Sequence, residues 1–291
     1  MRYRLALTIR YRFARPTGAA RQVLRICPAN LPGVQSVERC KVVVSPTPNE
    51  RHAHVDFFGM EAIGVVLAAG LSDLRFEMTA EVTRKDPGAA FDLSVPLAAL
   101  RADLAAETGL GADSPHHFLA PSPRIPVVPA ISRHAAAAVA GAPTTRAAVE
   151  ALGRALHRDM TFDARATEVD TPIATAFEGR HGVCQDFSQI MVAGLRSLGI
   201  PAAYVSGFLR TLPPPGRPRL QGADAMHAWV RAWTGAKGGW VDFDPTNACF
   251  AGSDHVTIGH GRDYGDTAPV TGMLRVSGAQ NGSHSVDMEA I

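Results

Sequence analysis

Residues 182–187 read Gly182-Val183-Cys184-Gln185-Asp186-Phe187, and this stretch decides how the second half of the chain folds. Apolar residues follow it with helical spacing, at Phe187, Ile190, Met191, Gly194, Leu195 and Leu198. This period predicts a core-facing helix of about four turns. Gly199 and Pro201 mark its C-terminal end. Cys184 is therefore expected in the first helical turn, directly after a glycine loop.

A cysteine at the start of a helix is well placed to act as a nucleophile. The unpaired N–H groups and partial positive charge of the helix N-terminus favour the thiolate, which is the attacking form. The helix dipole stabilises the thiolate by only about 0.3–1 kcal/mol. A cationic partner, usually a histidine, therefore has to supply the remaining stabilisation of the thiolate. The remaining cysteines, Cys27, Cys40 and Cys249, form no Cys-x-x-Cys pair and are interpreted as small apolar residues.

His227 is the candidate partner, because it opens an apolar strand that reads Met226-His-Ala-Trp-Val230. A third group has to orient such a histidine. Asp242 and Asp244 both lie on the next predicted strand, and their parity places them on the same face. The pattern alone leaves both carboxylates open as the orienting group.

Four segments together resemble the transglutaminase-like superfamily, which shares the core of papain-like cysteine proteases. They are Gly182-Val-Cys-Gln-Asp-Phe187, Gly199-Ile-Pro-Ala202, His227-Ala-Trp229 and Gly239-Trp-Val-Asp-Phe-Asp-Pro-Thr-Asn247. The resemblance implies a catalytic triad of Cys184, His227 and Asp244, because the aspartate of the family precedes Pro-Thr. The segment Gly261-Arg-Asp-Tyr264 and the strands near the N-terminus are similar to those of bacterial members of the superfamily.

The mechanism that the resemblance implies is acyl transfer through a thioester on Cys184. The expected substrate is a peptide or protein amide, and the acceptor is water or an amine, with hydrolysis favoured and no cofactor required. Gln185, Trp229 and Asp242 are candidates for the oxyanion hole or the substrate groove, although Trp229 also suits the core. A non-catalytic binding or assembly module on the same scaffold is the alternative function.

The expected fold class is α+β, with an antiparallel β-sandwich at the N-terminus and a papain-like core in which the cysteine helix packs on an antiparallel sheet. Residues 3–13 alternate between apolar and basic side chains, which predicts a half-buried strand. Further short strands separated by Pro, Gly and Asn extend the β-rich domain over 1–85. Residues 86–142 form a helical and Pro-rich connection, in which 121–129 is expected to be a stiff linker. The core with its C-terminal strands, near 273–277 and 283–288, spans 143–291.

Composition narrows the partners of this 291-residue chain. Its net charge of +2 is too small to support electrostatic binding of nucleic acid. No apolar run approaches the roughly 20 residues that span a bilayer, and no signal peptide is evident, so a cytoplasmic location without membrane partners is expected. Histidines at positions 52, 54, 116, 117, 255 and 260 show no spacing that closes a metal site. The proline-rich segment Pro213–Pro218 is expected to border and gate the groove.

Overall fold

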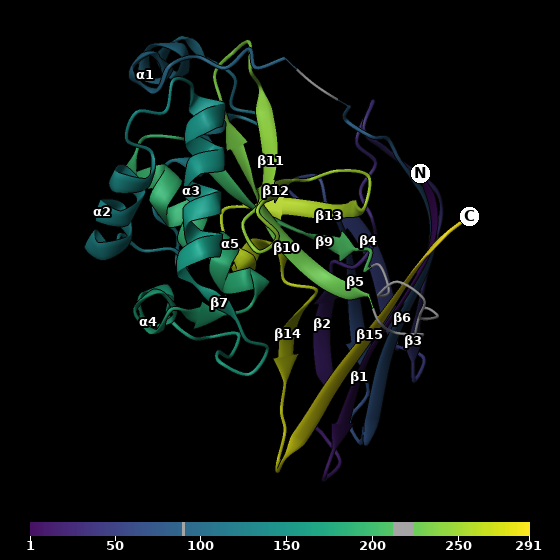
Figure 1. Ribbon diagram of the computed structural model, residues 1–291. Coiled ribbons are helices and arrows are strands. Elements are labelled where there is room, and N and C mark those ends of the chain that lie inside the picture. The colour runs from purple at the N-terminus through teal and green to yellow at the C-terminus, as the bar shows by residue number, and fades with distance from the viewer. Residues whose placement is uncertain (89–90, 212–223) are drawn as a thin grey trace, which may run out of the picture.

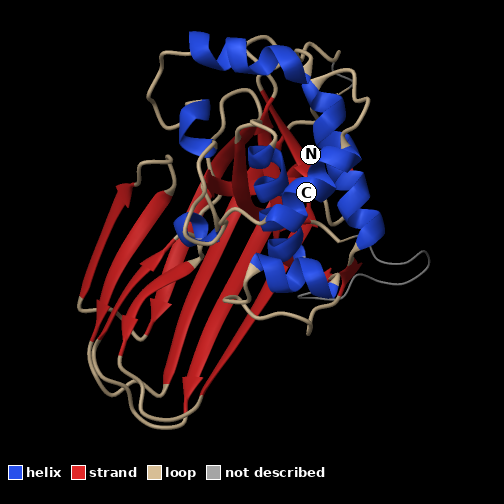
Figure 2. Cartoon of the chain, turned by 90° about the vertical axis from the view of Figure 1, so that its left-hand side faces the viewer, coloured by secondary structure: helices blue, strands red, loops and turns tan. Residues whose placement is uncertain are grey.

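The computed structural model describes residues 1–88, 91–211 and 224–291. A sandwich of strands packs against a second, helix-covered sheet, as Figure 1 shows. Viewed from the side, the helices gather at one end of the molecule and the long strands of the sandwich occupy the other (Figure 2). The predicted α+β class, with a β-sandwich and a cysteine-bearing helix on an antiparallel sheet, is confirmed.

The sandwich consists of two antiparallel sheets. The first has the order β15-β1-β6-β3, with bounds Gln280–Ala290, Arg2–Phe13, Asp73–Arg84 and Gln35–Ser45. The second has the order β14-β2-β5-β4, with bounds Val270–Leu274, Ala20–Leu24, Glu61–Leu67 and Glu50–Val55. The alternation in β1 explains the packing, because Leu5 and Leu7 point into the core beside Ala80 and Met78 of β6. Arg2, Arg4 and Arg12, which have the other parity, stay exposed.

The two C-terminal strands belong to this sandwich, which corrects their expected place in the 143–291 core. β15 pairs with β1 along its length, from Tyr3 opposite Ala290 to Phe13 opposite Gln280. β14 pairs with β2 at the edge of the other sheet. Strand pairing between the two ends of a chain leaves no local sequence signal, so periodicity found these strands without finding their partners.

The helix-covered core sheet, which is separate from the two sheets of the sandwich, has the order β12-β11-β10-β9-β13. Its strands are Cys249–Phe250, Trp240–Asp244, Ala225–Trp233, Ala202–Leu209 and His255–Gly261. A short parallel pair, β7 (Thr161–Phe162) and β8 (His181–Gly182), lies beside it in sequence before the cysteine helix. The helical elements are α1 (Leu97–Ala106), the 3-10 turn η1 (Pro115–Phe118), α2 (Pro129–Ala138), α3 (Thr145–Asp159), α4 (Ile173–Gly179), α5 (Cys184–Ser197) and α6 (Tyr264–Thr267).

Helix α5 is the predicted cysteine helix, and it is buried over most of its length. Helices α2 and α3 pack on it, and a Cβ added at Gly194 would come within 3.0 Å of Leu152 and 3.1 Å of Ala135. Sheet residues such as Val230 and Phe243 share its core. The small residue at 194 therefore lets three helices approach closely, which fixes where the N-terminus of α5 lies.

The Pro-rich stretch 121–129 is more ordered than a linker. Ser122 and Ile125 form a two-way backbone bridge, and Pro129 is the first residue of α2. Proline suits this position, because the first N–H of a helix has no intrahelical acceptor to lose. In the described ranges, no helix is both long and apolar enough to cross a membrane.

Strand β13 joins the sandwich to the helix-covered core sheet. Its Val256 and Ile258 lie in the core of the sandwich, while its backbone pairs with β9. Gln35 of β3 clamps it: Nε2 donates to the Thr257 carbonyl at 2.8 Å, and Oε1 accepts from the Thr257 N–H at 2.9 Å. The two parts of the molecule are thus tied by a buried amide that satisfies both backbone groups of one residue.

Replacing Gln35 with alanine is expected to lower the free energy of unfolding by about 2–3 kcal/mol, because buried backbone groups lose their partners. Urea unfolding followed by tryptophan fluorescence measures this loss. Ser36→Ala, at the exposed neighbouring position, serves as the control. An unchanged midpoint in Gln35→Ala would show that Gln35 does not hold β13 in place.

Candidate active site

Cys184 is the first residue of α5 and is partly exposed. The loop before it is held by Asp186, whose Oδ2 accepts from the Val183 N–H at 2.9 Å and from the Thr167 hydroxyl at 2.6 Å. A Cβ at Gly182 would lie 2.7 Å from that carboxylate oxygen, so only glycine fits. Asp186 is fully buried, and burial raises its pKa. These contacts explain why the motif needs a glycine and an aspartate on either side of the cysteine.

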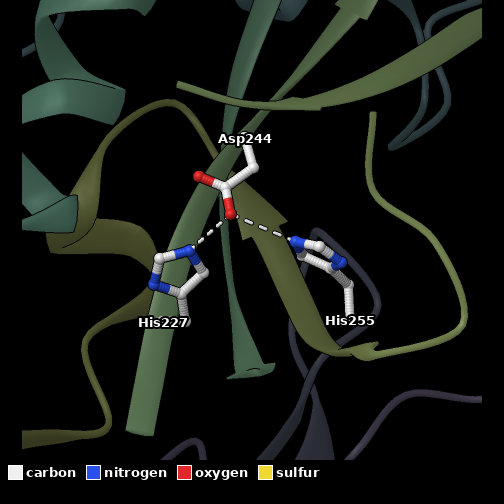
Figure 3. Close-up of side chains that lie close together, drawn as sticks. All are labelled: His227, Asp244 and His255. Atoms are coloured by element: carbon white, nitrogen blue, oxygen red, sulfur yellow. Dashed lines mark hydrogen bonds and ion pairs between the residues drawn. The ribbon is translucent and has the colours of Figure 1, made fainter. Parts of the chain in front are cut away.

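His227, on β10, is the group that meets Cys184. The side chain of Cys184 lies close enough to the imidazole to interact with it, and this interaction raises the pKa of His227. Nε2 of His227 lies 2.7 Å from Oδ2 of Asp244, and the other ring nitrogen points away from that carboxylate (Figure 3). Only 8 % of His227 is exposed. The structure therefore brings together the three side chains from α5, β10 and β11 that the sequence singled out.

Asp244 is fully buried and accepts five hydrogen bonds. Its Oδ1 accepts from the backbone N–H groups of Thr246 and Asn247, at 2.9 and 3.1 Å. Its Oδ2 accepts from His227, from Asn247 Nδ2 at 2.7 Å and from His255 Nε2 at 3.1 Å. The Asp-Pro-Thr-Asn turn thus folds back on its own first residue and saturates the buried carboxylate.

The two charges stabilise each other. Burial alone lowers the pKa of His227, but the interactions with Asp244 and Cys184 outweigh it and raise the pKa to about 10. Burial likewise raises the pKa of Asp244, and the hydrogen bonds of His227 and His255 overcome it, holding that pKa well below its usual range. At neutral pH the site therefore contains an imidazolium next to a carboxylate.

Asp242, the alternative orienting group, faces a different partner. Its Oδ2 accepts from the indole N–H of Trp229 at 3.0 Å, and its backbone carbonyl accepts from Ala251. Although Asp242 and Asp244 share one face of β11, only Asp244 reaches the turn beside His227. In the structure, Asp244 is the carboxylate that contacts His227, and Asp242 holds the indole N–H of the buried Trp229.

The structure places Trp229 in the core and engages the side chain of Gln185 with a backbone carbonyl. Trp229 is 0 % exposed, and it packs with Val205 and Ala251, so it supports the site from within the core. The side-chain amide of Gln185 donates to the Val169 carbonyl at 3.0 Å, which ties α5 to the preceding loop. The segment Pro213–Pro218, expected to gate the groove, lies outside the described residues.

Asn247 and His255 belong to the site, but sequence reasoning gave them no role in it. His255 was weighed only as a metal ligand, and its buried strand β13 lacks the alternation that marks a strand. Within the described part of the chain, His227, Asp244 and His255 place ligand atoms within 4.8 Å of one another. Direct hydrogen bonds of 2.7 and 3.1 Å already join these atoms, so the carboxylate oxygen is occupied by N–H donors.

Comparison with known proteins agrees with this architecture. Residues 133–245 match the transglutaminase-like superfamily, and residues 3–83 match the bacterial transglutaminase-like N-terminal region. A crystal structure from Cytophaga hutchinsonii, described as a candidate cysteine protease, superposes with a TM-score of 0.74 at 20% identity. The superposition covers 99% of this chain and 90% of that one, which shows a shared fold over nearly the whole molecule.

Curated relatives match over a shorter length. An uncharacterised protein of Mycobacterium tuberculosis is 40% identical over 126 residues, which is 42% of this chain and 40% of that protein. An uncharacterised protein of Mycobacterium leprae is 38% identical over 137 residues, 46% of this chain and 47% of the relative. The matched region thus spans less than half of the curated relatives.

The fold and site define a papain-like, cysteine-containing α+β protein. More specifically, the chain combines a transglutaminase-like core with the bacterial transglutaminase-like N-terminal region, and it is a member of the transglutaminase-like superfamily.

The raised pKa of His227 predicts a pH-dependent contribution to stability. A histidine whose pKa rises on folding, here from 6.5 to about 10, stabilises the fold fully below pH 6.5 and loses that effect as the pH rises towards 10. The loss of unfolding free energy caused by His227→Gln should therefore be largest at pH 6 and shrink steadily up to pH 10. Urea denaturation across this range measures it.

His284→Gln, on the exposed face of β15, is the matched control for the loss of a histidine away from the site. A cost of His227→Gln that does not vary between pH 6 and 10 would contradict the charge pairing.

Proposed function

We propose that this protein is a cysteine-dependent acyl-transfer enzyme that hydrolyses peptide or glutamine-type amides. The observation that supports the proposal most directly is the chain of contacts from the partly exposed Cys184 thiol through His227 to the buried Asp244. A nucleophile beside a proton carrier, which is itself hydrogen-bonded to an orienting carboxylate, provides the elements of this chemistry. Membership of the transglutaminase-like superfamily agrees with an enzyme of this kind.

In the first step, the Cys184 sulfur attacks the carbonyl carbon of the amide. The carbon–nitrogen bond then breaks, and His227 gives its proton to the leaving amine, which leaves a thioester. Because the pKa of His227 is about 10, this proton is present at neutral pH. In the second step, water attacks the thioester while His227 takes one of its protons. The carbon–sulfur bond then breaks, and the products are a carboxylic acid, the Cys184 thiolate and protonated His227.

The N-terminus of α5 is suited to stabilise the oxyanion of each tetrahedral intermediate. The backbone N–H groups of Cys184 and Gln185 lie in the first helical turn, where helix geometry provides no intrahelical acceptor. The side chain of Gln185 is engaged by Val169, so the proposed donors are backbone groups. The same hole serves water and amine acceptors, and hydrolysis is proposed because water needs no second binding site.

Cys184→Ala is expected to reduce turnover by at least about a thousandfold, since the nucleophile is lost. Stability should change by less than about 1 kcal/mol, because the side chain is only partly buried. The measurement is mass spectrometry of a peptide and glutamine-amide library, with and without an added amine. Cys40→Ala, at an exposed thiol of the sandwich, is the control. An active Cys184→Ala variant would sink the proposal.

A pair of aspartate variants on β11 separates the two carboxylates. Asp244→Asn should lower turnover by about a hundredfold to ten-thousandfold, because the His227 proton is no longer held in place. Asp242→Asn should remain close to wild type, since its carboxylate contacts Trp229. Steady-state kinetics on the best library substrate measures both. Equal losses in the two variants would contradict the assigned role of Asp244.

A further inference from the structure

The mechanism above makes no use of His255, although this side chain contacts the same oxygen as His227. His255 opens β13, and only 5 % of it is exposed. Its Nε2 lies 3.1 Å from Oδ2 of Asp244, and its ring packs edge to face against Trp229, with 5.3 Å between the centroids. Figure 3 shows the Asp244 oxygen between the two histidine rings.

The backbone determines which nitrogen of His255 carries the proton. The Gly252 N–H donates to Nδ1 at 3.2 Å, so that nitrogen has a free lone pair. The proton of the neutral ring is therefore on Nε2, which donates it to the Asp244 carboxylate. The backbone N–H of His255 in turn donates to the Gly252 carbonyl at 3.2 Å. This tight turn fixes both the tautomer and the direction of the ring.

The second donor restricts how the carboxylate can move. Two backbone N–H groups hold Oδ1, while His227, His255 and Asn247 converge on Oδ2. A rotation of the carboxylate that weakened the bond to His227 would also break the bond to His255. The two rings approach the same oxygen, so the position of one is coupled to the other through Asp244.

We propose that His255 is a positioning residue of the active site, which donates from Nε2 to Asp244 and thereby keeps the carboxylate oriented towards His227. This inference rests on the proposed function, in which Asp244 orients the proton carrier. In this proposal, His255 does not act on the thiol or the amide directly, and it affects the reaction only through its hydrogen bond to Asp244.

The sandwich holds the residue before His255. The buried Tyr3 of β1 donates its hydroxyl proton to Asp254 Oδ1 at 2.7 Å, and the Arg210 N–H donates to the Asp254 carbonyl at 3.1 Å. Tyr3 is therefore connected to Asp244 by a short relay: its hydrogen bond to Asp254, the peptide bond from Asp254 to His255, and the hydrogen bond from His255 to Asp244. This gives the β-sandwich a part in the geometry of the site.

Two substitutions at position 255 separate hydrogen bonding from packing. His255→Phe keeps an aromatic ring against Trp229 but has no N–H, whereas His255→Gln supplies an N–H donor of similar reach. His255→Phe should lower kcat by about tenfold to a hundredfold, the cost of a misplaced catalytic group, with KM unchanged. His255→Gln should restore most of kcat. Equal losses in both variants, or a change confined to KM, would overturn the proposal.

A second measurement does not need a substrate. With carbon-13 in the aspartate carboxyl groups, NMR titration reports the protonation of Asp244 directly. The His255 hydrogen bond helps to hold the pKa of Asp244 low, so His255→Phe should raise that pKa and His255→Gln should keep it low. An Asp244 titration that is the same in all three proteins would overturn the proposal, whatever the enzyme acts on.

The two measurements also separate the failure of this inference from the failure of the proposed function. If Cys184→Ala abolishes no activity but the Asp244 titration shifts as expected, the acyl-transfer function fails and the positioning role of His255 stands. Tyr3→Phe tests the relay: it should lower kcat in the same direction as His255→Phe, and a fully active Tyr3→Phe variant would end the relay at Asp254.

Discussion

The buried carboxylate of Asp244 organises the active site. A carboxylate removed from water is costly unless donors and an opposite charge surround it, and here five hydrogen bonds and the His227 imidazolium do so. These partners come from three parts of the chain: strand β10, the turn after Asp244, which supplies three of the hydrogen bonds, and the start of β13. The charge is tolerated only when all three are in place, so the core sheet and the site form together.

The glycines of the core serve this arrangement by letting backbones approach closely. A Cβ at Gly207, the β9 partner of His227, would lie 2.4 Å from the ring of Trp229. A Cβ at Gly153 of α3 would lie 2.1 Å from the ring of Phe243, next to Asp244 in sequence. Large aromatic rings thus fill the space that glycines leave open, and the histidine and aspartate are held by a rigid, densely packed support.

Local patterns in the sequence predicted the parts of the site that depend on local structure. The helix at Cys184 follows from the spacing of Phe187 to Leu198 and from the glycine before it, and both signals lie within one element. Parity placed Asp242 and Asp244 on one face, but the choice between them depends on where β11 ends and its turn begins. Trp229 has the parity of His227, yet Ala251 and His255 cover it, and nothing near it in the sequence indicates that cover.

Non-local pairing accounts for the features that the sequence did not predict. Every residue of β13 is buried, so its sequence shows no alternation of polar and apolar side chains. The partners of β14 and β15 lie at the opposite end of the chain, and their pairing depends on the whole fold. His255 follows the same logic, because its role exists only once β13 has been placed between the sandwich and the core sheet.

The pairing of β1 with β15 also bears on the order in which the protein can fold during synthesis. The strand that covers the edge of β1 is synthesised later than β1, after every other strand of that sheet. Until then, one edge of the first sheet presents unpaired backbone groups to any other extended chain. Contacts this distant in sequence close slowly, so the edge of β1 is where an incomplete chain is open to strand pairing with a second copy.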